Sequence, residues 1–451
     1  MRPIAHKGAP LAQVLGAVAP IWAQVRRGQS LERALRDRAR APGAASDPAQ
    51  LAAVRDVCHD ALRHLALIEA LLARLAPRAP APQVTGLLAA ALSQLLDSAY
   101  ADHVVVDQAV TAARADRGLR PASGFVNAVL RSFLRRRATL VPQLMAIDAT
   151  RLNVPPWWLA RVQRDHPARW QGALATAHRA PPLVLRVNRR RVDVDTYLAR
   201  LHGEGIDASR VGDSAVWMHR ARPVELIAGF ADGLVSVQDA GAQLAAPWLD
   251  ARDGMHVLDA CAAPGGKTGH LAELSQANID AVELDAERAA RIDDNLRRLG
   301  LLGPRVRVLI GDAARADSFW DGRPYQRILL DAPCTGSGVV RRHADIPWLR
   351  RDSDVAQLAT IQAGLLDALW PLLAPAGRLL YVVCSVFREE AAQQADSFLE
   401  RHPNARLVPL PGTQHGSLQL LPAGADPFEL DATVGLPTVH DGFFFALFEK
   451  V

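Results

Sequence analysis

Apolar residues recur at intervals of three and four along the first part of the chain, the spacing that gives a helix one buried face. The pattern predicts helices over residues 11–40, 51–75, 83–99, 107–115 and 123–136. Prolines at positions 77, 80 and 82 interrupt the pattern and mark a loop. We therefore predict an all-helical domain over residues 1–140.

The pattern becomes mixed after residue 140. Pro155-Pro156-Trp157-Trp158 opens a predicted helix that runs to His166. Residues 183–188 and 215–219 are predicted strands, and a helix over 193–202 separates them. We predict a small α+β domain over 141–235. The three arginines at 189–191 suit contact with nucleic acid, although the domain could equally serve only as a linker.

Strands and helices alternate from residue 236 to the end. The predicted strands are 257–260, 279–283, 306–310, 328–331 and 379–384, with helices over 287–299 and 355–373. This alternation is typical of a doubly wound α/β sheet, which binds ligands at the carboxyl ends of its strands. Polar residues fall at each of those ends: Asp259, Glu283, Asp312, Asp331 and Cys384.

The loop after the first of these strands has the geometry of a cofactor site. A glycine turn, Gly265-Gly266, leads into a predicted helix whose N–H groups would face a ligand. The phosphate-loop pattern requires a glycine where Cys261 stands, and no G-x-G-x-x-G motif is present, so neither phosphate-binding motif applies. Lys267 follows the turn in a chain with only three lysines, which indicates that a compact ammonium is needed there.

Two cysteines lie near predicted strand ends. Cys334 follows Asp331-Ala332-Pro333 on a glycine-rich loop, and Cys384 ends the strand 379–384. A buried strand cysteine is usually inert, but a thiol at a carboxyl end beside polar loops can ionise and attack. A zinc-dependent cytidine deaminase would need a second cysteine in a Pro-Cys-x-x-Cys motif, which is absent.

Charge and composition limit the class of protein. Residues 1–240 hold 32 Lys and Arg against 20 Asp and Glu, and residues 241–451 hold 20 against 27. The basic part either meets a polyanion or carries solvated arginines. Four scattered cysteines with no C-x-x-C pair argue against disulfides and zinc. With no long apolar segment and no export signal before the first helix, we expect a cytoplasmic protein with no membrane span and no metal.

Three motifs resemble those of the RNA cytosine-C5 methyltransferases. They are Asp-Ala-Cys-Ala-Ala-Pro-Gly-Gly-Lys-Thr at 259–268, Asp-Ala-Pro-Cys-Thr-Gly-Ser-Gly at 331–338 and Tyr-Val-Val-Cys-Ser-Val at 381–386. Residues 124–131, 339–348 and 441–445 match the bacterial RsmB type (also called Sun or Fmu), which modifies 16S ribosomal RNA. The resemblance implies a NusB-like RNA-binding domain over 1–140, a linker domain over 141–235 and a Rossmann-like methyltransferase domain over 236–451.

The resemblance also implies how the reaction proceeds. Cys384 would add to C6 of the target cytosine and so activate C5, and Cys334 would serve the release step. Asp331 would hold and polarise the cytosine edge, beside Lys267. The target base must leave its stack to reach such a pocket. Chemistry alone leaves the two thiols interchangeable, because in DNA cytosine methyltransferases the Pro-Cys thiol is the nucleophile.

The implied cofactor is S-adenosylmethionine. Residues of the glycine loop would line its site: Cys261, Ala262, Ala263, Pro264, Gly265, Gly266 and Lys267. Glu283 would hold the ribose hydroxyls, Asp312 the adenine end and Asp331 the region near the methionine part. The family usually has Asp where this chain has Glu283, and the longer arm keeps the charge.

We therefore expect a monomeric 16S ribosomal RNA methyltransferase whose arginine-rich part binds RNA with an affinity that falls as salt rises. RNA specificity is expected from fold and unpaired bases. Two alternatives stay open: the same chemistry on tRNA or another RNA, and an RNA-binding assembly or antitermination factor that lacks catalysis. The sequence does not identify the target nucleotide, the stage of ribosome assembly or the base that removes the C5 proton.

Overall fold

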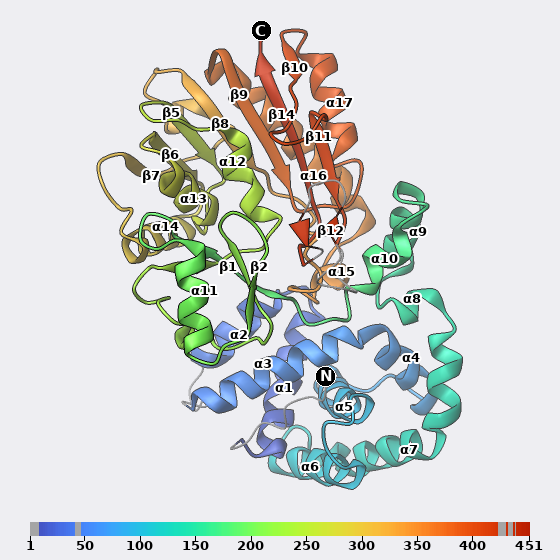
Figure 1. The fold of residues 1–451 in the computed structure, drawn as a ribbon. Helices are drawn as coiled ribbons and strands as arrows, with labels where there is room; N and C mark the ends of the chain where they lie inside the picture. Colours follow the sequence, from blue (N-terminus) through green and yellow to red (C-terminus); the bar gives the residue numbers. More distant parts are fainter. Residues whose placement is uncertain (1–8, 41–46, 423–429, 432–435, 438) are drawn as a thin grey trace. The chain divides into compact units, whose positions relative to one another are not determined.

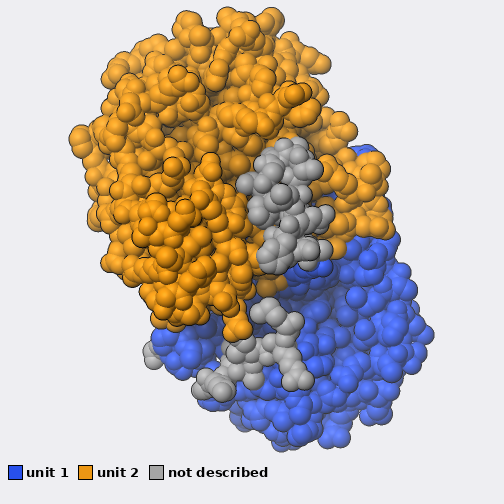
Figure 2. All heavy atoms as spheres, viewed as in Figure 1, with its two compact units in different colours: residues 1–164, 177–179, 340–351 blue, residues 165–176, 180–339, 352–451 orange. Residues whose placement is uncertain are grey.

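The computed structural model describes residues 9–40, 47–422, 430–431, 436–437 and 439–451. Residues 1–8, where we expected no export signal, lie outside that range. The chain forms two compact units (Figure 2): residues 1–164, 177–179 and 340–351, and residues 165–176, 180–339 and 352–451. No helix among the described residues is long and apolar enough to cross a bilayer.

The first unit is helical (Figure 1). Its helices are α1 (Leu11–Val25), α2 (Leu31–Arg40), α3 (Pro48–Arg63), α4 (Leu65–Leu75), α5 (Pro82–Leu96), α6 (Asp102–Ala115), α7 (Ser123–Met145), α8 (Asp148–Arg151), α9 (Pro156–Asp165) and α15 (Ile346–Leu349). The single stretch predicted over 11–40 is two helices, because Gly28 adopts a φ of 99° between them. The stretch predicted over 51–75 likewise breaks at His64.

The segment 340–351 completes the core of this helical unit. Ala344 is 2% exposed within the cluster that contains Leu15 and Phe133, and Trp348 packs against that cluster. Asp345 Oδ2 accepts a hydrogen bond from Leu31 N at 2.8 Å, which satisfies a backbone donor at the start of α2. The helical core therefore includes Ala344, which lies 180 positions after residue 164, where the first segment of this unit ends.

The second unit contains a small antiparallel sheet of order β2-β3-β1-β4. Its strands are β1 (Leu183–Val187), β2 (Ala208–Arg210), β3 (Ala215–Met218) and β4 (Val235–Val237). The preceding helix is α10 (Trp170–Ala175), and α11 (Val194–Gly203) packs Tyr197 and Leu201 against Val187 and Val216. The two predicted strands and the helix between them are present, whereas β2 and β4 were not predicted.

An eight-stranded sheet dominates the second unit, in the order β10-β14-β9-β8-β5-β6-β7, with β11 paired to β14. Its strands are β5 (His256–Ala260), β6 (Asn278–Glu283), β7 (Val306–Ile310), β8 (Tyr325–Asp331), β9 (Leu373–Val383), β10 (Ala405–Leu407), β11 (Ser417–Leu420) and β14 (Phe443–Lys450). Strands β5 to β9 pair in parallel, and β14 runs antiparallel to β9. A separate pair comprises β12 (Leu430–Asp431) and β13 (Leu436–Pro437).

Helices cover both faces of this sheet. Val257 packs in one core cluster with α12 (Ala245–Leu249), α13 (Gly266–Leu274) and α14 (Ala286–Leu299). Leu258 points to the opposite cluster, which is shared with α16 (Asp352–Leu369) and α17 (Ala392–Arg401). The predicted doubly wound α/β fold is confirmed. The helix predicted over 355–373 is wrong at its end, because Leu373 already opens β9.

Candidate active site

The predicted cofactor loop, residues 261–267, connects β5 to α13 through two left-handed residues. Cys261 has a φ of 61° and Gly265 a φ of 91°. A Cβ on Gly265 would stand 3.0 Å from Ile292 of α14, so both the conformation and the space require glycine. The turn delivers the chain to the start of α13, whose first N–H groups have no partners within the helix.

Asp259 and Thr268 join the two ends of this loop. The Thr268 hydroxyl donates to Asp259 Oδ2 at 2.6 Å, and both residues are fully buried. The other carboxylate oxygen, Oδ1, has no hydrogen-bond partner among the described residues. Burial raises the pKa of Asp259 to about 7.

Glu283 ends β6 and reaches back to the cofactor loop. Its carboxylate accepts hydrogen bonds from Ala263 N at 3.3 Å and Asp285 N at 3.2 Å, and Arg288 lies 3.3 Å away. The side chain of Glu283 is only 3% exposed. The longer arm relative to aspartate thus braces the loop, while its charge stays at the strand end.

The ends of β6 and β7 expose apolar side chains that sequence reasoning missed. Leu284, directly after β6, is 69% exposed, and Ile310, the last residue of β7, is 61% exposed. Glu283 and Ile310 are neighbours in the β6–β7 register. Asp312 is half-buried just beyond Ile310 and accepts a hydrogen bond from Ala314 N at 2.9 Å. The signal available in the sequence was a large apolar residue at the end of each of these two strands. Their exposure is unusual, because parallel strands are normally covered on both faces.

The two thiols meet at the ends of β8 and β9. Asp331 pairs with Val382 in the parallel register, so the loop carrying Cys334 and the residue after β9, Cys384, emerge side by side. Their sulfur atoms lie 3.4 Å apart, and both side chains are half-buried. Neither cysteine forms a disulfide bond with a described residue.

Lys267 and Asp331 form an ion pair in the same place. Lys267 Nζ lies 2.5 Å from Asp331 Oδ2, with the side chains 12% and 32% exposed. Burial lowers the pKa of the Lys267 amino group, but the Asp331 carboxylate outweighs that effect and the pKa lies above its ordinary value. The Cys384 sulfur raises it further, so the ammonium interacts electrostatically with that thiol.

The pKa values of Cys334 and Cys261 are both raised, which keeps these two side chains in the thiol form. The hydrogen bond with Cys384 and burial raise the pKa of Cys334 well above its ordinary value, and the negative charge of Glu390 adds to the effect. Burial raises the pKa of Cys261 to about 12. Of the two thiols in contact, Cys384 is therefore the one beside a cation and Cys334 the one beside an anion.

The predicted site residues fall into two neighbouring groups along the carboxyl ends of the strands. On one side of β5, Glu283 ends β6 and Asp312 follows β7. On the other side, Asp331 ends β8, and Cys334 and Cys384 follow β8 and β9. The loop 261–267, which follows β5, lies between them. Strand order places such a loop at the point where connections diverge, which is where open α/β sheets bind ligands.

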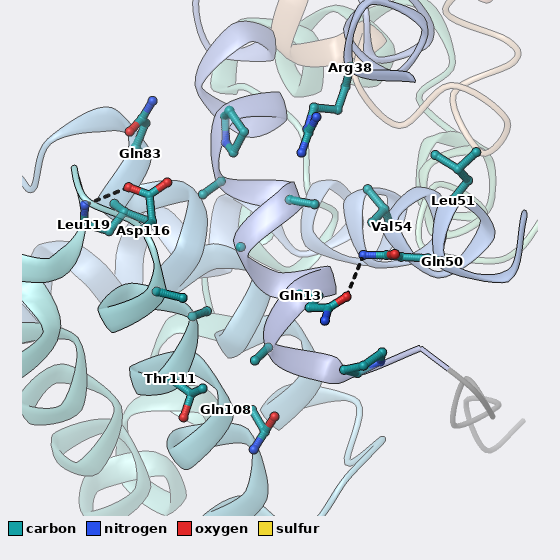
Figure 3. A pocket seen from close by; sticks show the side chains of 18 residues that line it. Gln13, Arg38, Gln50, Leu51, Val54, Gln83, Gln108, Thr111, Asp116 and Leu119 are labelled. Carbon is teal, nitrogen blue, oxygen red and sulfur yellow. Dashed lines mark hydrogen bonds between the residues drawn. The ribbon is translucent and has the colours of Figure 1, made fainter. Parts of the chain in front are cut away.

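A pocket of about 920 Å³ in the helical unit is a poor candidate for the reaction site. Figure 3 shows that its lining combines amide side chains with apolar ones and with Arg38. Two of the amides, Gln13 of α1 and Gln50 of α3, are joined by a 3.3 Å hydrogen bond. Among the described residues that line it, Asp116 is the one carboxylate, and there is no thiol or histidine. The chemistry-bearing residues lie instead at the sheet of the second unit.

Comparison with known proteins supports the same assignment in three parts of the chain. The NusB family matches residues 11–135, the ferredoxin-like domain of RsmF/B-like methyltransferases matches 154–225, and the family described as 16S rRNA methyltransferase RsmB/F matches 246–449. The ribosomal RNA small subunit methyltransferase B of Salmonella newport is 39% identical over 403 residues, which cover 88% of this chain and 89% of that protein.

Solved structures share the fold. The crystal structure of PH0851 has a TM-score of 0.75 at 24% identity and covers 97% of this chain and 99% of that one. A methyltransferase homologue from Pyrococcus horikoshii has a TM-score of 0.55 at 28% identity, covering 67% and 97%. Together with the confirmed arrangement of a NusB-like helical part, a ferredoxin-like sheet and a Rossmann-like domain, these relatives show that the chain belongs to the RsmB/F family of S-adenosylmethionine-dependent 16S rRNA methyltransferases.

Proposed function

We propose that this protein transfers a methyl group from S-adenosylmethionine to C5 of one cytosine in 16S ribosomal RNA, through a covalent bond between Cys384 and C6 of that cytosine. One observation carries the proposal: two thiols lie 3.4 Å apart at the strand ends, and the electrostatic surroundings distinguish them. The relatives named ribosomal RNA small subunit methyltransferase B supply the substrate class.

Cys384 is the nucleophile in this proposal. Its sulfur interacts electrostatically with the Lys267 ammonium, and the thiolate is the form of a thiol that attacks. Addition of the thiolate to C6 makes C5 electron-rich enough to accept a methyl group. When a base removes the C5 proton, the electrons of that C–H bond re-form the C5–C6 double bond and expel Cys384 as a thiolate.

Cys334 serves the release step. Because its pKa is raised, it remains a thiol and can donate its proton toward the Cys384 sulfur at 3.4 Å as that sulfur regains its charge. Asp331 would accept a hydrogen bond from the cytosine amino group; its partly exposed carboxylate, paired with Lys267, supports this role. These assignments give Cys384, Cys334 and Asp331 three separate tasks.

The residues at the other strand ends fit the proposed cofactor. The carboxylates of Glu283, Asp312 and Asp331 match a sulfonium cation and ribose hydroxyls, and the exposed side chains of Leu284 and Ile310 offer an apolar surface for an adenine ring. The loop 261–267 would hold the methionine part. When bound, S-adenosylmethionine supplies the methyl group.

A trapping assay tests the assignment of the thiols. Purified protein, S-adenosylmethionine and protein-free 16S RNA are mixed, and denaturing gels are run for the wild type, Cys334→Ser and Cys384→Ser. We expect Cys334→Ser to accumulate a covalent protein–RNA band, because release is blocked, and Cys384→Ser to give neither adduct nor 5-methylcytosine. Cys58→Ala, which removes a thiol from the helical core, should behave as the wild type.

The alternatives give different results in the same assay. A covalent band with Cys384→Ser instead would exchange the two roles. Methylation of tRNA transcripts and not of 16S RNA would reassign the substrate. A protein that binds RNA but yields no adduct, no 5-methylcytosine and no heat of S-adenosylmethionine binding in calorimetry would be an assembly factor without catalysis.

A further inference from the structure

Glu390 is a buried carboxylate that the proposed reaction leaves without a task. Its side chain is fully buried, and it accepts four hydrogen bonds. Oε1 accepts from Thr335 N at 2.8 Å and from Gln362 Nε2 at 3.1 Å. Oε2 accepts from the hydroxyls of Thr335 and Ser385, each at 2.6 Å. Burying a carboxylate is costly unless donors satisfy it, and here four donors do so.

The donors identify what this carboxylate holds together. Thr335 directly follows Cys334, and Ser385 directly follows Cys384. A single oxygen atom, Glu390 Oε2, therefore binds the residue next to each thiol. The two loops are 50 residues apart in the chain, so their spacing depends on tertiary contacts of this kind.

Further hydrogen bonds join the same two loops. Ser337 Oγ lies 2.9 Å from Ser385 Oγ and accepts from Val386 N at 2.8 Å. Gly338 N donates to the Cys384 carbonyl at 2.9 Å. Outside the loops, Gln362 of α16 donates to the Pro333 carbonyl at 2.9 Å as well as to Glu390. Glu390 is the member of this network that contacts both loops and the helix behind them.

We propose that Glu390 is a positioning residue that fixes the distance between the Cys334 and Cys384 thiols, so that attack and release occur on one cytosine without rearrangement of the loops. The inference rests on the proposed function and adds to it a residue that touches neither RNA nor cofactor. Misplacing reacting groups by about 1 Å can lower a rate by about 100-fold, which sets the size of the expected effect.

Two substitutions of Glu390 distinguish its role in positioning the two loops from the effect of its negative charge. Glu390→Ala removes all four hydrogen bonds. Glu390→Gln keeps the Oε1 acceptor for Thr335 N, and its amide can donate to the two hydroxyls, which can reverse direction. We expect kcat of Glu390→Ala to fall by about 100-fold, with the KM for RNA and the affinity for S-adenosylmethionine within about threefold of the wild type. Glu390→Gln should stay within about fivefold of the wild-type kcat.

Asp280→Asn is the matched control. Asp280 of β6 is another buried carboxylate, and His256 of β5, Arg307 of β7 and Tyr325 of β8 bind it. It lies toward the start of its strand, whereas the thiols follow the ends of β8 and β9. We expect Asp280→Asn to lower the melting temperature without the loss of kcat that Glu390→Ala causes. An equal loss of kcat in this control would overturn the inference, because general destabilisation would then account for the effect.

The other outcomes distinguish failure of this inference from failure of the proposed function. Full kcat in Glu390→Ala would overturn the inference and leave the proposed function standing. A wild-type protein that forms no adduct and no 5-methylcytosine would overturn both. Glu390→Gln as inactive as Glu390→Ala would assign the role to charge and overturn positioning. If Glu390→Ala fails to fold, Ser385→Ala and Thr335→Val replace it, each expected to lower kcat about tenfold; unchanged kcat in both would overturn the inference.

Discussion

Asp259 carries a titratable group into the fully buried end of β5. Its carboxyl group has one hydrogen-bond donor, Thr268, and its pKa is raised by burial to about 7, against 3.8 for an ordinary aspartate. Between these two values the folded protein holds a proton that the unfolded chain has released. Stability from this group is therefore complete below about pH 4 and is lost as pH rises through 7.

The substitution Asp259→Asn removes this titratable group and tests whether its contribution to stability falls as pH rises. We expect the free energy of unfolding of the wild type, relative to Asp259→Asn, to fall by up to about 4 kcal/mol between pH 4 and pH 8.5, since three pKa units correspond to that amount. Urea unfolding of both proteins at several pH values, without cofactor, measures the difference. A difference that is constant with pH would show that Asp259 is ionised throughout.

Candidate site residues could be named from the sequence because strand ends are visible in the apolar pattern. Cys384 and Asp331 follow apolar runs, and parallel strands bring their carboxyl ends to one edge. The sequence could not show that Glu390 binds both thiol loops. Buried glutamates are rare, and its partners depend on the pairing of β8 with β9 rather than on spacing along the chain.

At the scale of elements, an arginine from the small sheet supports the cofactor loop. Arg186 of β1 is fully buried and forms two hydrogen bonds with Glu273 of α13, at 2.9 and 2.8 Å. Its remaining nitrogen donates to the Gly266 carbonyl at 2.6 Å. The ferredoxin-like sheet thus fixes one side of the turn that would hold the methionine part of S-adenosylmethionine.

This contact predicts separate effects on stability and on cofactor binding. Arg186→Met leaves the Glu273 charge buried without its partner and should cost about 3–5 kcal/mol of unfolding free energy. The double variant Arg186→Met/Glu273→Leu should regain most of that stability. In both variants the Gly266 carbonyl loses the hydrogen bond from Arg186, so we expect roughly tenfold weaker S-adenosylmethionine binding.

Denaturant unfolding and calorimetry on the two variants measure these effects. Recovery of cofactor affinity together with stability in the double variant would contradict a role for Arg186 in holding the turn.

The elements themselves were only partly predictable. Helices and central strands follow from periodicity, and the capping side chain of Asp47, which accepts from Ala49 N at 3.0 Å, is a local signal at the start of α3. Strand β14 was missed, although Phe443 to Phe448 is almost entirely apolar. Such a run is buried on both faces between β9 and β10, and short apolar runs do not reveal their partners.

At the scale of the whole molecule, the compact units of the structure do not correspond to three consecutive stretches of sequence. The segment 340–351 lies between β8 and α16 but contributes Ala344 and Trp348 to the helical core. The small sheet belongs to the same compact unit as the methyltransferase sheet. Long-range packing of this kind leaves no periodic trace, so the domain borders at 140 and 235 remain predictions from pattern alone.

The distribution of charge leads to a prediction about RNA binding. Residues 1–240 carry an excess of 12 positive charges, and residues 241–451 an excess of 7 negative charges. If the first part binds ribosomal RNA, each arginine that neutralises a phosphate contributes about 0.7–0.9 to the slope of log K against log salt. Arg131, Arg135 and Arg136 are exposed on α7 and are the residues we would replace with Gln.

We expect this triple variant to bind 16S RNA more weakly and to lower the salt slope by about 2, because three phosphate contacts are lost. Filter binding between 50 and 300 mM salt measures the slope. The control replaces three exposed arginines of the acidic part, Arg291, Arg297 and Arg323, and changes net charge by the same amount. Equal salt slopes for the two variants would mean that net charge alone governs the affinity. The arginines of the helical unit would then have no special role in binding RNA.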